Sequence, residues 1–130
     1  MSDLLKDIED YLIAGNLAVA DGTDLFRDKV PDSPDTAIII SEYGGILPTL
    51  GVAAYDRSVQ IIVRDKTYAG AKRTSWGLFN YLVAANEPIV NITPTRWGII
   101  HGRAMPFKFQ EDKQARIWFV FNLGITTIGD

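Results

Sequence analysis

The side chains that could perform catalysis are few in this chain, and their spacing does not assemble a catalytic site. His101 is the only histidine, which excludes a multi-histidine metal site, and the absence of cysteine excludes disulfides, thiolate metal sites and cysteine nucleophiles. We interpret His101 as structural, because a single histidine in an apolar-flanked strand usually is. The chain also lacks a glycine-rich phosphate loop, a dinucleotide-binding fingerprint and a nucleophile elbow. The sequence therefore predicts no enzyme, no resident metal and no cofactor.

Two groups of carboxylates do not predict a site either. Asp7, Glu9 and Asp10 fall in a helical stretch, where we expect them to form a solvated face. Asp21 and Asp24 bear a superficial likeness to a calcium loop, but the alternating oxygen ligands and the distal glutamate of such a loop are absent. A turn is the expected structure there. Glycoside hydrolysis would need two carboxylates facing each other across a cleft, whereas the acids here lie mainly in turns and helix starts.

Two cations stand out by their position. Arg64 closes a predicted strand on its polar face, and Lys72 falls within the otherwise apolar arc of the helix that follows. Each side chain either extends into solvent past the edge of the sheet or pairs with a carboxylate from Asp35, Glu42 or another subunit. We favour the first interpretation for Lys72. Both stay open for Arg64, because arginine suits bidentate pairs at interfaces.

These cations are positioned by a strand that runs directly into a helix. Over residues 55–65 apolar side chains alternate with mostly polar ones, which predicts a strand with one apolar face and one solvent-facing polar face. From Thr67, whose hydroxyl can cap a helix, apolar residues recur every three or four positions as far as Asn86, where Glu-Pro follows. This pattern predicts a helix of about five turns. The helix must bury its apolar stripe, and the sheet is the nearest apolar surface.

The remaining segments predict a second helix and further strands around this unit. An apolar stripe from Leu4 to Leu12 predicts an N-terminal helix that Gly15 ends. Alternation and flanking turn residues predict extended segments over residues 17–20, 25–27, 36–43, 89–92, 97–103, 107–110 and 115–125, the last being the longest strand. With 130 residues, of which 47% are hydrophobic, the chain is long enough for one core and too short for two. We therefore predict a single α+β domain over residues 1–130, with a mostly antiparallel or mixed sheet, an N-terminal helix and one long helix packed on it.

Residues 44–54 are unusually apolar for a connection between elements. The two glycines that begin this segment should break the preceding strand, and Ile46, Leu47 and Leu50 lie in the long connection that follows. Such a loop either folds back on the body of the protein or binds a partner. Both interpretations stay open at this point.

The charge and hydropathy of the chain argue against two further classes of protein. A net charge of -3 argues against nonspecific binding of nucleic acid, because that mode needs a positive field over the phosphates. No apolar run is long enough to cross a bilayer, and the acidic, polar N-terminus is unlike a signal peptide. We expect a soluble protein that is intracellular when it is made.

The order of the predicted elements resembles a known family of proteins. Its motifs are Pro-Asp-Ser-Pro-Asp at 31–35, Ala-Ile-Ile-Ile at 37–40, Glu-Tyr-Gly-Gly at 42–45, the strand 59–64 leading into the helix 68–83, and Phe-Val-Phe-Asn-Leu at 119–123. These motifs, which span nearly the whole chain, resemble the small minor capsid or tail terminator proteins of long-tailed bacteriophages. Before the last strand an Asp-Glu-Gly-Arg type of turn would be expected from the resemblance. This chain has Glu-Asp-Lys-Gln-Ala-Arg at 111–116 instead.

The resemblance implies a structural virion protein that needs no catalytic residue. Such a protein would cap the head-proximal end of a tail tube as a six-membered ring, stop tube growth and form the surface that joins the filled head. Its partners would be copies of itself, the tail tube protein and a head-completion or neck protein, with assembly in the host cytoplasm and no membrane. The genome would pass through the ring without specific binding, so an acidic or mixed lumen is expected.

We expect the subunit or tube contacts at the apolar loop and at the polar end of the neighbouring strand. The candidate interface residues are Gly44, Gly45, Ile46, Leu47, Leu50, Arg57 and Arg64. Two alternatives stay open: a head-completion or neck adaptor protein of the same virion, and a small-ligand binding domain. The ligand pocket would be lined by Trp76, Trp97 and Trp118, although aromatic residues at such spacings are more often part of the core.

Overall fold

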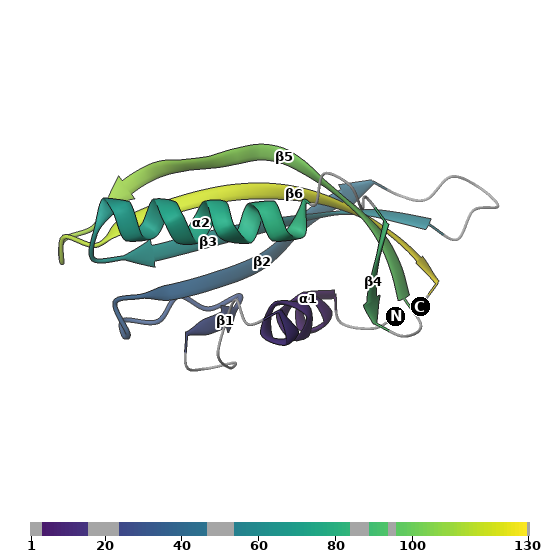
Figure 1. Cartoon of the computed structure of the whole chain (residues 1–130), viewed down its shortest axis with the longest axis horizontal. Coiled ribbons are helices and arrows are strands. Elements are labelled where there is room, and N and C mark those ends of the chain that lie inside the picture. Colours follow the sequence, from purple (N-terminus) through teal and green to yellow (C-terminus); the bar gives the residue numbers. More distant parts are fainter. Residues whose placement is uncertain (1–3, 16–23, 47–53, 84–88, 94–95, 130) are drawn as a thin grey trace.

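The computed structural model of the chain describes residues 4–15, 24–46, 54–83, 89–93 and 96–129, which form two helices and a six-stranded sheet (Figure 1). In chain order the elements are α1 (Leu4–Ala14), β1 (Leu25–Arg27), β2 (Ala37–Ile46), β3 (Ala54–Asp65), α2 (Tyr68–Leu82), β4 (Ile89–Thr93), β5 (Arg96–Glu111) and β6 (Ile117–Gly129). The predicted α+β fold, with an N-terminal helix and a second helix on a sheet, is confirmed.

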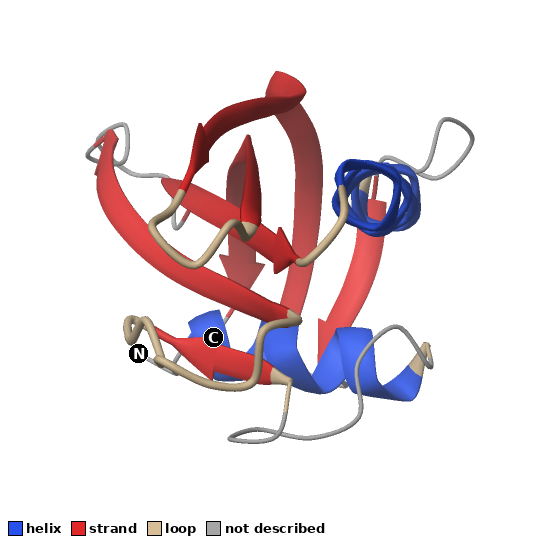
Figure 2. Ribbon diagram, turned by 90° about the vertical axis from the view of Figure 1, so that its left-hand side faces the viewer, coloured by secondary structure: helices blue, strands red, loops and turns tan. Residues whose placement is uncertain are grey.

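The strands form a single mixed sheet in the order β1-β2-β3-β6-β5-β4. β1 pairs with β2 in parallel, and the four remaining pairs of neighbouring strands are antiparallel. The centre of the sheet is the pairing of β3 with β6, which extends from Ala54 opposite Ile128 to Asp65 opposite Ile117. The sheet is strongly twisted, and α1 and α2 run nearly across one another against it (Figures 1 and 2).

Both helices cover the same face of the sheet, which we call the front face. Ile8 of α1 and Leu78 of α2 belong to one hydrophobic cluster with strand residues such as Ile61 and Phe121. The opposite face, the back face, has a smaller cluster made of Phe26, Ala37 and Ile39, with Ile62 packed beside it. β2 contributes to both clusters, which explains why its sequence is apolar at successive positions.

α2 begins where the sequence predicts and ends earlier. The Thr67 hydroxyl accepts a hydrogen bond of 3.0 Å from the N–H of Gly70, so the predicted cap is confirmed. The helix ends before Val83, whose backbone is not helical (φ -105°, ψ 61°) and whose N–H closes the last turn on the carbonyl of Phe79. α2 therefore has 15 residues, about four turns instead of five. The predicted stop at Asn86 lies outside the described residues.

β2 is longer than the sequence predicts. The strand continues through the glycine pair to Ile46, because a register shift between Tyr43 and Gly45 absorbs the extra residue as a bulge instead of ending the strand. The rest of the predicted connection, residues 47–53, lies outside the described part of the chain, as does the strand predicted at residues 17–20.

β5 is also longer and joins two predicted segments. The stretches 97–103 and 107–110 are one strand of 16 residues, which exceeds the 13 of β6, so the prediction that the last strand is the longest is wrong. Pro106 is tolerated because it falls within a register shift between Ala104 and Phe107, where no described strand pairs with the outer edge of β5.

Candidate subunit interface

The end of the β2–β3 hairpin contains an ion pair between the two strands. Arg57 donates from Nε and Nη2 to the two carboxylate oxygens of Glu42, and the Nη2 bond is 2.8 Å long. The pair is bidentate and the Arg57 side chain is only 15% exposed. Arg57 lies on the front face, because side chains alternate along a strand and Val59, two positions later, is in the front-face core. The pair therefore closes the core at this end of the sheet.

The end of β2 that contains the candidate residues Gly44, Gly45 and Ile46 lies beside this pair. The bulge in β2 places Gly45 opposite Arg57. Beyond Ile40, no described strand pairs with the outer edge of β2, since β1 ends there. Among the described residues the backbone of the last part of β2 is therefore a sheet edge without a partner strand, and such an edge can pair with another chain. Leu47 and Leu50 lie outside the described residues, so their contacts stay a prediction.

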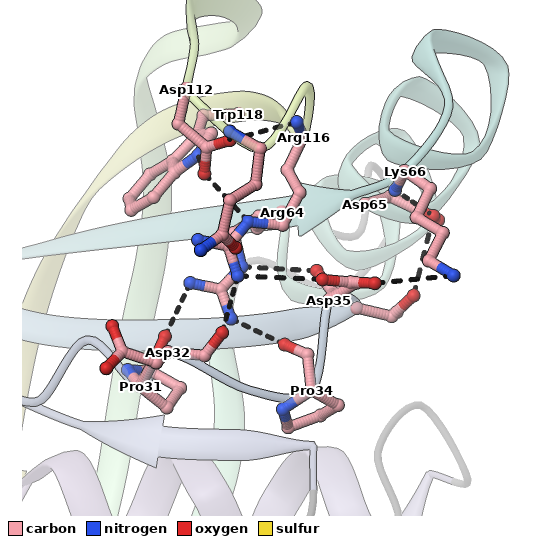
Figure 3. A network of polar contacts seen from close by, with 12 residues as sticks. Pro31, Asp32, Pro34, Asp35, Arg64, Asp65, Lys66, Asp112, Arg116 and Trp118 are labelled. Carbon is pink, nitrogen blue, oxygen red and sulfur yellow. Dashed lines mark hydrogen bonds and ion pairs between the residues drawn. The ribbon is translucent and has the colours of Figure 1, made fainter.

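Arg64 neither extends into solvent nor pairs mainly with a carboxylate, which were the two interpretations of the sequence. Its side chain is fully buried, with 0% exposure, and donates to three backbone carbonyls: Pro31 at 2.6 Å, Asp35 at 3.1 Å and Pro34 (Figure 3). Its guanidinium also lies 5.5 Å from the centre of the Trp118 ring. Burial lowers the pKa of Arg64 from its ordinary value. The polar face of β3 is thus not open to solvent at this end, because the segment between β1 and β2 covers it.

Asp112 organises the turn between β5 and β6 beside Arg64. Its carboxylate accepts hydrogen bonds from the Trp118 indole at 3.0 Å, from Arg116 Nε at 2.8 Å and from the backbone N–H groups of Gln114 and Arg116. Burial opposes ionisation of Asp112, but these hydrogen bonds outweigh it and hold the pKa of Asp112 well below its usual range. In the same turn Ala115 has a φ of 59°, a left-handed conformation that glycine adopts more easily.

These side chains fasten the segment between β1 and β2, residues 28–36, which we call the connector. Arg116 donates from Nη1 to the carbonyl of Asp32 at 2.6 Å. The Asp35 carboxylate lies 3.7 Å from Arg116 and 3.3 Å from the ammonium of Lys66 (Figure 3). Two buried guanidinium groups therefore hold four carbonyls of the connector. A loop held in this way is preorganised for binding, because little conformational entropy remains to be lost.

The carboxylates of α1 are not all solvated, contrary to the expectation from the sequence. Glu9 is 2% exposed, and its Oε2 lies 3.6 Å from Nε of Arg27 at the end of β1. A buried carboxylate needs a cation nearby, and the packing of α1 beside β1 supplies one. Asp10 is exposed, as expected, and pairs with Lys6 at 3.2 Å. The Glu9–Arg27 contact attaches the helix to the sheet, whereas the Lys6–Asp10 pair lies within the exposed surface of the helix.

A row of exposed apolar side chains on β5 was not predicted from the sequence. Met105, Phe107 and Phe109 are 66%, 48% and 42% exposed. Phe109 meets Trp118 edge to face, with ring centres 5.9 Å apart. The alternation of these residues indicates a strand, but it does not show that the apolar face is uncovered. Apolar side chains gathered on a protein surface often mark a contact site.

α2 carries a second exposed apolar surface. It is a shallow groove of about 530 Å³, which we call the α2 groove, lined by Tyr68, Ala69, Lys72, Arg73 and Trp76. Tyr68 is 51% exposed, and Nζ of Lys72 lies 5.9 Å from the centre of its ring. Lys72 is exposed, as the favoured interpretation expects. The groove combines aromatic rings with two cations and no acid.

The two tryptophan side chains that the structure describes, Trp76 and Trp118, do not line a common pocket. Trp76 lies on α2, where its ring centre is 5.6 Å from that of Phe79. Trp118 lies on β6 in contact with Arg64 and Asp112. The side chain of Trp97 is outside the described part of the structure. Within that part, no group of three or more histidine, cysteine, aspartate and glutamate side chains could hold a metal ion.

Exposed apolar surfaces and a fastened connector on an α+β body are features of a protein that works by assembling with other chains. Neither described helix is long and apolar enough to cross a membrane. The family model for bacteriophage tail terminator proteins matches residues 12–127. The chain belongs to this family, which confirms the resemblance seen in the sequence, and it is a structural component of a phage tail. No curated protein matches the chain.

Proposed function

We propose that this protein ends the growth of the tail tube by capping its head-proximal end as a closed ring of copies, six by resemblance to the family. The observation that carries the proposal is the family match over residues 12–127. The exposed apolar surfaces on β5 and α2 support it, because such surfaces suit subunit contacts.

The proposed ring is built from heterologous contacts. Each copy presents two different patches to its neighbours, and the assembly is finite when the rotation between copies closes. One face of the ring must imitate the next layer of the tube, whereas the opposite face must not accept a further layer. Growth stops because of this asymmetry, and no reactive side chain is needed.

We propose that the end of the β2–β3 hairpin supplies one of the contact patches. The patch comprises Gly44, Gly45, Ile46, Leu47, Leu50 and Arg57. Its support is the edge of β2, which no described strand pairs with beyond Ile40, beside a partly exposed ion pair. Arg64 is buried within the protomer, so we propose that it acts on contacts through the connector that it holds.

The proposed ring binds the tail tube protein on one face and a head-completion or neck protein on the other. Assembly takes place in the host cytoplasm, before the tail joins the filled head. The genome passes through the lumen without specific binding, since an acidic or mixed lining keeps phosphates from adhering.

Tube assembly from purified components tests the proposal. Tail tube protein alone should form tubes without a fixed limit of length. Addition of this protein should stop elongation and leave a ring at one end of each tube in electron micrographs. Tubes that continue to grow in the presence of excess protein would overturn the proposal. Binding to filled heads but not to isolated tails would instead identify a neck adaptor.

A further inference from the structure

The connector presents a small apolar and acidic surface from a fixed position. Val30 is 56% exposed and lies between Asp28 and Asp32, both of which are exposed. Only one cation, Lys29, lies among these residues. Buried arginines hold the carbonyls on the inner side of the connector. The outer side can therefore bind a partner with little further loss of conformational entropy.

The α2 groove has the complementary composition. Tyr68 and Trp76 supply apolar surface, and Lys72 and Arg73 supply two exposed cations. An apolar side chain flanked by carboxylates is therefore the kind of partner that suits this groove. Opposite charges at the rim of an apolar contact accelerate association and fix the register of the two surfaces.

The two surfaces lie on opposite faces of the sheet. The connector covers the back face, where it is fastened to Arg64 and Arg116 (Figure 3). α2 packs on the front face. The connector is therefore placed to meet the groove of a neighbouring copy. A contact between the back of one copy and the front of the next is heterologous, as a ring requires.

We propose that the connector of one copy docks in the α2 groove of a second copy of this chain, with Val30 between the rings of Tyr68 and Trp76 and the two aspartates beside Lys72 and Arg73. This inference rests on the proposed ring. It gives the buried arginine network a role, because the network sets the shape of the docking surface.

Charge reversal on the two surfaces tests the inference. The K72E/R73E variant makes the groove acidic, and the D28K/D32K variant makes the connector basic. In sedimentation velocity over a concentration series, each variant alone should self-associate at least about tenfold more weakly than the wild type, since like charges then face each other. An equal mixture of the two variants should regain wild-type association, because both kinds of contact are again complementary in alternating copies.

The control exchanges the charges of an exposed pair on α1, with the K6E/D10K variant, which should associate as the wild type does. A single cooperative melting transition for every variant would show that each is folded. D28K/D32K should melt lower than the others, because Asp28 has a φ of 51°, a left-handed conformation that aspartate tolerates better than lysine does. The inference is overturned if the wild type stays monomeric at every concentration, if the two reversed variants associate normally, or if their mixture associates no better than each alone. Reversed variants that still stop tube growth would remove this contact while leaving the proposed capping function intact.

Discussion

Arg64 and Pro31 are separated by 33 positions in the chain, yet the guanidinium of Arg64 donates a hydrogen bond of 2.6 Å to the Pro31 carbonyl. This contact is the centre of the network that holds the connector on the back face. Removal of the guanidinium by Arg64→Met should lower the free energy of unfolding by about 3 kcal/mol, because three carbonyls lose their donor in a buried site. Urea unfolding measures the change. Arg73→Met, at an exposed position, should change stability by less than about 0.5 kcal/mol. Equal effects at the two positions would show that the hydrogen bonds of Arg64 do not stabilise the fold.

The backbone of Ala115 predicts a stabilising substitution. Its φ of 59° is strained for a residue with a Cβ atom and relaxed for glycine. Ala115→Gly should therefore raise the free energy of unfolding by about 0.5–1 kcal/mol. The opposite sign is expected for Ala69→Gly in the helix α2, where glycine costs up to about 1 kcal/mol. Thermal melting of the two variants compares them directly, and a loss of stability in both would show that Ala115 is not strained.

The hydrogen bonds to Asp112 predict a pH dependence of stability. The pKa of Asp112 is lowered in the folded protein, whereas it is about 3.9 in the unfolded chain. As the pH falls, the unfolded state takes up the proton first. The stabilisation from ionised Asp112 is thus complete above about pH 5 and is lost as the pH falls through 3.9 toward the folded pKa.

Melting temperatures of the wild type and Asp112→Asn measure this contribution. The wild type should melt higher near neutral pH, and the difference between the two proteins should narrow as the pH is lowered from about 5 to 3. Asp10→Asn, at an exposed pair, is the control and should differ little from the wild type at any pH. A difference for Asp112→Asn that stays constant with pH would contradict the assignment.

Two glycines predict opposite effects of the same substitution. A Cβ atom on Gly15 would lie 2.5 Å from the hydroxyl oxygen of Tyr81, whose ring packs against Tyr11 with centres 5.0 Å apart. Gly15→Ala should therefore cost about 1–3 kcal/mol, as overpacking does. A Cβ atom on Gly77 meets nothing within 4 Å, and Gly77→Ala should stabilise α2 by up to about 1 kcal/mol. Denaturant unfolding measures the stability of both variants. If Gly15→Ala has the stability of the wild type, the Tyr81 side chain moves aside without cost and the prediction is wrong.

Local signals account for the parts of the structure that the sequence predicts well. The Thr67 cap, the α1 stripe and the alternation in β3 depend on residues a few positions apart, and periodicity reports such neighbours directly. The strand boundaries that were predicted wrongly, in β2 and β5, depend on bulges. The glycines of β2 and Pro106 of β5 indicate breaks, but register shifts against neighbouring strands absorb them.

The candidate site was only partly predictable because its partners are distant in the chain. Arg116 bonds to the carbonyl of Asp32 across 84 positions, and Glu9 pairs with Arg27 only because α1 packs beside β1. A carbonyl acceptor has no signature in the sequence, since every residue carries one. The sequence therefore suggested solvent or a carboxylate as the partner of Arg64, whereas its hydrogen-bond partners are backbone carbonyls.

The Arg57–Glu42 pair allows a test that separates stability from assembly. Arg57→Glu places two carboxylates together and should cost about 2 kcal/mol in unfolding free energy. The exchanged pair, E42R/R57E, restores opposite charges. Its free energy of unfolding should lie within about 1 kcal/mol of the wild-type value, the remaining difference arising because the two side chains differ in length and position. If Arg57 also contacts a neighbouring copy, the exchanged variant should be stable in urea unfolding yet form fewer rings in sedimentation velocity and electron microscopy. Recovery of both stability and ring formation would assign the pair to the protomer alone and remove Arg57 from the proposed contact patch.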